Sequence, residues 1–99
     1  MFGLHVRFVA QPGQGDALEA ILLEADEALA EREACRLHVV SRSPEEPESV
    51  WVTEAWTSRE EHQRSLEDER VRALIERARP LIADVADRTE LRPVGGKGL

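Results

Sequence analysis

Three side chains near the middle of the chain combine the types that proton transfer with an aromatic molecule requires. They are Glu54, Trp56 and His62, which supply a carboxylate, an indole and an imidazole. Imidazole has an ordinary pKa close to neutrality, so it can accept a phenolic proton near pH 7. Tryptophan can form a flat wall for an aromatic substrate, with its indole N–H available to a substrate oxygen. The set indicates a candidate acid–base site; a core tryptophan and a packing histidine are the structural alternatives.

Local spacing determines where these side chains point. In a strand over residues 50–56, Glu54 and Trp56 share a face with Val52, because side chains alternate along a strand. A carboxylate in such an apolar row must be paired or protonated. Glu54 is therefore expected to form a salt bridge or hydrogen bond across strands or subunits, or to act as a general base. His62 lies on the inward stripe of the following helix, near the positive end of the dipole, which favours a neutral ring.

The remaining candidates for metal or nucleophile chemistry are weaker. His5 and His38 lie on expected strands, and no His-x-His or Glu-x-x-His pair provides metal-ligand spacing. Both are interpreted as hydrogen-bonded interface histidines, and no metal site is expected. Cys35 is the only cysteine, which excludes an internal disulfide and any multi-cysteine metal site. It is interpreted as a small packing residue.

Capping patterns and periodicity give the elements that must position these residues. Asp16 followed by Glu19 resembles a capping box, Ser58 with Glu61 forms a second one, and Pro80 ends the second helix. Alternation with period two marks the strands. The expected elements are strands over residues 3–10, 35–42, 50–56 and 83–92, and helices over about residues 16–32 and 58–80, the second with an interruption at 68–70 that would divide it into two short pieces.

This order predicts an α+β, ferredoxin-like βαββαβ fold with a four-stranded antiparallel sheet. At 99 residues the chain is expected to form a single domain, with a core over about residues 2–92 and a flexible tail over 93–99. Both helices should cover one face of the sheet. Trp51 and Ala55 lie on the other face, so we expect a second copy of the chain to cover it and form a homodimer.

Composition argues against two classes of partner. The net charge is -7 and no run of basic residues occurs, so we expect no nucleic-acid binding. The N-terminal residues do not resemble a secretory signal, and no apolar stretch is long enough to span a bilayer. We therefore expect no membrane partner and a cytoplasmic location.

The segment from Trp51 to His62 resembles the Glu-x-Trp strand end and following helix of the antibiotic biosynthesis monooxygenase family. Pro12-Gly13 before the first helix, Cys35 opening the second strand and Pro80-Leu81-Ile82 after the second helix agree with it. The resemblance covers about residues 2–92. It implies a member of the dimeric α/β-barrel superfamily, similar to quinol monooxygenases, in which two sheets form a shared barrel.

The resemblance also implies a function. Family members with known activity oxidise polyketide phenols or quinols with molecular oxygen and no metal or flavin, in a pocket between sheet and helices. Carried onto this sequence, Trp56 is the platform and His62 the acid–base residue. The alternative is a non-catalytic dimeric binding module for a hydrophobic or haem-like ligand. The residues expected to bind the substrate are Val52, Glu54, Ser65 and Leu66. Val52 replaces an asparagine of certain relatives, so the substrate should differ from theirs. Ser65 stands where some relatives carry a histidine, so the proton-transfer mechanism should differ from theirs as well.

Overall fold

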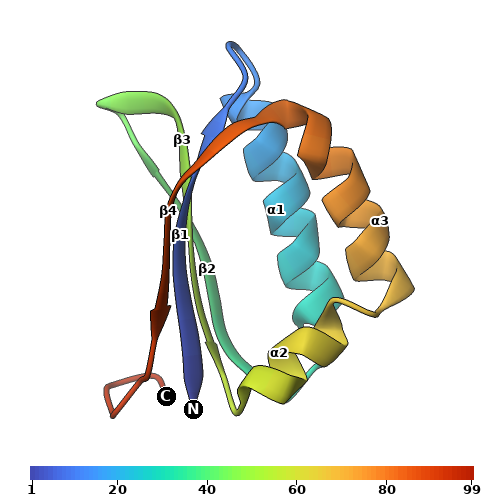
Figure 1. Cartoon of the computed structure of the whole chain (residues 1–99), viewed down its shortest axis with the longest axis vertical. Helices are drawn as coiled ribbons and strands as arrows, with labels where there is room; N and C mark the ends of the chain where they lie inside the picture. The colour runs from blue at the N-terminus through green and yellow to red at the C-terminus, as the bar shows by residue number, and fades with distance from the viewer.

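The computed structural model describes all of residues 1–99 and confirms the predicted ferredoxin-like fold. A four-stranded antiparallel sheet in the order β2-β3-β1-β4 carries all the helices on one of its faces (Figure 1). The elements are β1 (Phe2–Ala10), α1 (Gly15–Leu29), β2 (Cys35–Ser43), β3 (Glu46–Trp56), α2 (Arg59–Ser65), α3 (Glu69–Ala78), the 3-10 turn η1 (Arg79–Leu81) and β4 (Ile82–Leu91).

The hydrophobic core lies between the sheet and the helices. Its largest fully buried side chains are Trp56 and Val50 of β3 and Leu18 of α1. Ile21 and Leu29 of the predicted α1 stripe are also buried, because residues three and four apart share one face of a helix. Phe2, Leu4, Val6 and Ala10 of β1 are buried in the same core. This core fixes the helices above the central strands β1 and β3.

The two predicted helix starts have different outcomes. The Ser58 hydroxyl accepts a hydrogen bond from the Glu61 N–H at 3.2 Å, which confirms the start of α2. The Asp16 capping box is wrong, because no side chain of α1 caps its own N-terminus. The carboxylate of Glu48 performs this role from β3, accepting hydrogen bonds from the N–H groups of Gly13 at 3.1 Å and Gly15 at 3.2 Å. A long-range contact thus replaces the expected local cap.

The helical segment after β3 is divided into two pieces as predicted, but the break lies at residues 66–68 rather than at 68–70. Asp68 caps α3, its carboxylate accepting from the N–H groups of Arg70 at 2.8 Å and Val71 at 3.3 Å. The segment ends at η1, which contains Pro80, as predicted. In contrast, α1 ends at Leu29 rather than near Arg32. None of the helices combines the length and apolar character needed to cross a membrane.

The β2–β3 hairpin is tighter than predicted. The connection expected over residues 43–48 is reduced to a turn at Pro44 and Glu45, because Ser43 already pairs with Glu46. A strand tolerates Pro47 there since β1 pairs with β3 only as far as Ser49, so the missing N–H of the proline has no partner strand on that side. The extra length of β3 brings Glu48 to the start of α1.

The outer face of the sheet has no helix over it (Figure 1), although Ala55 is buried there and Pro93 lies beside Gly3 on the same face. Trp51 is partly exposed there, and Val39 of β2 is 42% exposed. His5 belongs to this face, and its Nδ1 lies 3.0 Å from the Thr53 hydroxyl oxygen. The face therefore presents both apolar side chains and polar groups that are already hydrogen-bonded, a composition suited to binding a partner.

Candidate functional site

The structure brings all six predicted site residues to one pocket between the sheet and the helices. Its volume is about 190 Å³, and most of its lining is hydrophobic. Residues of β3 form its floor, and α1, α2 and α3 together supply its cover. The predicted residues that line it are Val52, Glu54, Trp56, His62, Ser65 and Leu66.

Trp56 and Glu54 form one unit in the pocket floor. Trp56 is fully buried, and its indole N–H donates a hydrogen bond of 3.0 Å to a carboxylate oxygen of Glu54. The expectation that this N–H is available to a substrate is therefore wrong. Glu54 is paired, as expected for a carboxylate in an apolar row, but to its own strand rather than across strands. Trp56 can offer a flat apolar wall, and the polar edge of the floor belongs to Glu54.

His62 stands above this floor and is almost fully buried. Its ring centroid lies 5.4 Å from that of Trp56, at an interplanar angle of 72°, and 5.3 Å from that of Phe2. Its Nε2 atom is 3.8 Å from Glu54 Oε1, beyond hydrogen-bond distance. The imidazole is thus packed between two aromatic rings beside a carboxylate.

Burial lowers the pKa of the His62 imidazole below its ordinary value, because a charged ring is poorly solvated there. Glu54 opposes this shift, while the charges of Arg88 and Arg59 add to it. The neutral ring expected from the sequence is therefore favoured. Its main cause is desolvation rather than the helix dipole.

The two other predicted residues of the helical segment line the pocket in different ways. The Ser65 hydroxyl donates a hydrogen bond of 2.6 Å to the backbone carbonyl of His62, so it is already engaged. Leu66 is 42% exposed and lines the pocket from its open side. Ser65 therefore supports the position of His62, and Leu66 contributes apolar surface at the opening.

An ion pair and a cation–π contact of Arg59 hold α2 over the sheet. The guanidinium of Arg59 donates two hydrogen bonds, of 2.9 and 2.8 Å, to the carboxylate of Glu90 on β4. It also lies 4.6 Å from the centroid of the Phe2 ring. The hydrogen bonds from Arg59 lower the pKa of Glu90 to about 2. The helix that carries His62 is thus tied to the far edge strand of the sheet.

A larger apolar pocket lies beside the first one, toward β4. Its volume is about 360 Å³, and it shares Phe8, Leu22 and Ile75 with the pocket that contains His62. Arg79 is the one lining residue that is not hydrophobic. A ligand with an aromatic ring beside Trp56 would have room for an apolar extension in this direction.

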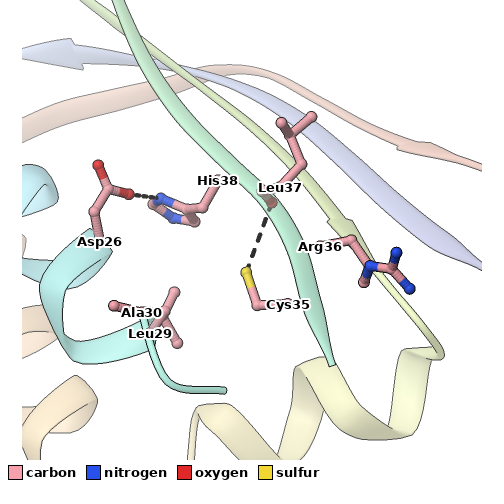
Figure 2. Close-up of a pocket in the computed structure, with 7 residues that line it drawn as sticks. All are labelled: Asp26, Leu29, Ala30, Cys35, Arg36, Leu37 and His38. Carbon is pink, nitrogen blue, oxygen red and sulfur yellow. Dashed lines mark hydrogen bonds and ion pairs between the residues drawn. The ribbon is translucent and has the colours of Figure 1, made fainter. Parts of the chain in front are cut away.

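A third cavity, of about 170 Å³, lies between α1 and β2 (Figure 2). His38 lines both this cavity and the His62 pocket, and its Nδ1 contacts the carboxylate of Asp26. The expectation that His38 is an interface histidine is wrong, because this side of β2 faces the helices. Asp26 could have been noticed from its spacing: it lies four residues after Leu22 and three before Leu29, at the edge of the α1 stripe.

Cys35 in the same cavity has the properties of a packing residue. Its thiol donates a weak hydrogen bond of 3.7 Å to the Leu37 carbonyl. Burial raises the pKa of the thiol to about 11, so the nucleophilic thiolate is disfavoured at neutral pH. No group of three or more His, Cys, Asp or Glu side chains is arranged to hold a metal ion.

Comparison with protein families gives one match. Residues 1–77 of the chain match the model of the family described as antibiotic biosynthesis monooxygenase. No curated protein matches the chain.

Several solved structures are similar over nearly the whole length. A Chloroflexus aurantiacus protein, whose name places it among antibiotic biosynthesis monooxygenases, is 41% identical with a TM-score of 0.88, over 96% of this chain and 94% of its own. A Mycobacterium tuberculosis protein is 18% identical with a TM-score of 0.83, over 97% of each chain. A Deinococcus radiodurans protein is 21% identical with a TM-score of 0.81, over 97% of this chain and 95% of its own. The last two likenesses concern the fold alone.

Proposed function

The chain belongs to the antibiotic biosynthesis monooxygenase family, and from that membership we propose that it is a cofactor-independent monooxygenase. In this proposal it oxidises a small aromatic, a polyketide phenol or a quinol with molecular oxygen in the pocket between sheet and helices. The observation that carries the proposal is the buried, neutral imidazole of His62 beside the indole of Trp56 in an apolar pocket.

His62 acts as the general base in this proposal. A neutral imidazole can take the proton from a phenolic oxygen, and the electron-rich phenolate can then pass an electron to oxygen. The carboxylate of Glu54, 3.8 Å away, stabilises the imidazolium that forms. Trp56, which has no solvent-exposed surface, forms the apolar backing of the floor on which the substrate ring would lie, and the apolar lining excludes water from the reacting atoms.

The sizes of the two neighbouring pockets support a small aromatic substrate with an apolar extension. An apolar cavity of about 150 Å³ is sufficient for benzene, so the pocket of about 190 Å³ beside Trp56 fits one ring. The neighbouring space of about 360 Å³ could receive further rings or an alkyl chain. A substrate of this shape is apolar overall and has one ionisable oxygen directed at His62.

The first test is oxygen uptake by protein freed of metal with a chelator. We expect oxygen consumption with at least one member of a panel of quinols and anthrones, measured with an oxygen electrode. If no compound is turned over, the proposal is wrong. Spectroscopic titration with aromatic ligands and haem then tests the alternative, because binding without oxygen-dependent conversion would indicate a binding module.

We also propose that the outer face of the sheet forms a homodimer interface. Its apolar side chains include Trp51 and Val39, which the chain itself leaves uncovered. Covering this face would bury apolar surface that a small single core lacks. Tryptophan is also among the residues that most often dominate binding energy in interfaces.

The dimer is tested with a charge on this face. We expect light scattering to give a dimer for the wild-type protein at micromolar concentration, and a monomer for Trp51→Glu, because the interface would have to bury an unpaired carboxylate. Leu23→Glu is the control, since Leu23 is 45% exposed on α1, away from the outer face. A monomeric wild-type protein would contradict the proposal.

A further inference from the structure

One histidine–carboxylate pair beside the pocket has no part in the function proposed above. His38 on β2 contacts Asp26 on α1 through Nδ1 (Figure 2). The His38 side chain is only 10% exposed, whereas that of Asp26 is 31% exposed. The pair therefore connects a nearly buried imidazole to a carboxylate that is in contact with solvent.

His38 lies in the wall between two cavities. It lines the pocket that contains His62 and also the outer cavity that contains Asp26, and Asp26 lines only the outer one. Nδ1 contacts Asp26, whereas Nε2 makes no hydrogen bond within the chain and is not among the buried unpaired atoms, so it borders accessible space. A proton on this ring could be exchanged on the pocket side.

His38 and His62 approach the same carboxylate from different elements. His38 is the register partner of Glu54 on the neighbouring strand, and both side chains line the pocket. His62 on α2 is 3.8 Å from Glu54. The charged and titratable groups around His38 are thus Asp26 from α1 and Glu54 from β3, with His62 beyond Glu54. Cys35 and Arg36 of its own strand line the same outer cavity. Two imidazoles border the space where the substrate ring would lie.

We propose that His38, held by Asp26, is a second acid–base residue of the pocket, which delivers a proton to the oxygen-derived intermediate. This inference rests on the proposed monooxygenase function. His38 would contact the reacting atoms and be a catalytic residue. Asp26 acts through His38 and is a positioning residue, because it retains the Nδ1 proton and leaves Nε2 to transfer protons.

The oxidation of a phenol to a quinone needs two such groups. His62 takes the phenolic proton, and the phenolate donates two electrons to oxygen as a C–O bond forms. Protonated His38 then gives its Nε2 proton to the resulting peroxide. Neutral His38 next removes the C–H proton as the O–O bond breaks, and the departing hydroxide takes the proton from His62. The products are a quinone and one water, and both histidines return to their starting forms.

The test compares matched variants of the pair. His38→Gln should lower kcat by about 10²-fold or more with little change in KM, because general acid–base catalysis affects the chemical step. Asp26→Asn should lower kcat about 10-fold or more. Glu27→Gln is the control, since this neighbouring α1 carboxylate is exposed and only meets Arg70 at 4.0 Å. If His38→Gln keeps kcat within about threefold of wild type, the inference is overturned.

Nitrogen-15 NMR of the histidine rings gives a readout that does not depend on turnover. The neutral His38 ring should carry its proton on Nδ1 in the wild type and in Glu27→Gln, and should move toward the Nε2–H form in Asp26→Asn. Hydroquinone added under argon should shift the Nε2 resonance of His38. A shift confined to His62, or a neutral wild-type His38 ring that carries its single proton on Nε2, would overturn the inference even if the enzyme is active. If the protein shows the expected NMR shifts but consumes no oxygen, the role of the His38–Asp26 pair is supported and only the monooxygenase function is rejected.

Discussion

Replacement of His62 by glutamine is expected to lower kcat for the oxidation of a quinol or anthrone by about 10²–10⁴-fold, the usual contribution of a general base. Glutamine keeps a polar side chain of similar length between Phe2 and Trp56, but it cannot take a proton. Oxygen uptake under saturating substrate measures the effect. KM should change less than kcat, because the aromatic walls of the pocket remain in place.

A matched control lies on the same helix. Arg64 is exposed on α2 and pairs only with Glu61, so Arg64→Gln should leave kcat unchanged. If His62→Gln retains kcat within about threefold of the wild type, His62 is not the base. Urea unfolding of both variants separates a loss of chemistry from a loss of structure.

The pH dependence has a defined sign. Burial lowers the pKa of His62, so the ring stays neutral below the ordinary value of about 6.5. The acid limb of kcat/KM should therefore have a midpoint below this value, and activity should fall as pH falls through it. Stability follows the same direction. Between the ordinary pKa of about 6.5 and the lowered pKa in the folded protein, the unfolded chain binds a proton at His62 that the folded chain does not. The stability that His62 contributes therefore decreases as the pH falls through this range.

Replacement of Trp56 by alanine is expected to reduce the free energy of unfolding by about 3–5 kcal/mol, the range for a fully buried large aromatic side chain. Trp56 has no exposed surface, and it packs with Phe2, Val71 and Leu29 in one core cluster. The substitution also leaves the Glu54 carboxylate without its donor in a nearly buried position. A domain of this size is typically stable by only about 5–15 kcal/mol, so much of its stability would be lost.

Two further variants make the stability measurement specific. Trp56→Phe keeps most of the volume and loses the hydrogen bond, so its effect should be clearly smaller than that of Trp56→Ala. Leu23→Ala removes an exposed leucine from α1 and should change stability by no more than about 0.5 kcal/mol. All are compared by urea unfolding at one protein concentration, so that any dimer contributes equally. Equal losses for Trp56→Ala and Leu23→Ala would contradict the assignment of Trp56 to the core.

Most of the pocket could be predicted because its residues follow local rules. Alternation alone places Val52, Glu54 and Trp56 on one face of β3. The Ser58 cap fixes the start of α2, and helical periodicity then turns His62 and Ser65 inward. Both kinds of pattern depend only on neighbours in sequence, so they remain valid whatever the rest of the chain does.

The face of β2 that meets the helices could not be predicted in the same way. Alternation correctly separates Leu37 and Val39 from His38 and Val40, but the more apolar pair lies on the outer face, where Val39 is 42% exposed. The side of a strand that faces the core is set by its register with the next strand. Here His38 pairs with Glu54, which itself faces the helices. An interface role was therefore assigned to His38 wrongly.

By itself, the sequence determined the order of the elements, the faces of β3 and α2, and the six residues that meet in one pocket, because periodicity and capping are local properties. Only the tertiary structure decided which polar groups become partners. Glu48 caps α1 from a strand more than thirty residues away in sequence, and Asp26 of α1 holds His38 of β2. Such pairs depend on where the helices sit above the sheet, and that position is set by packing of the whole core.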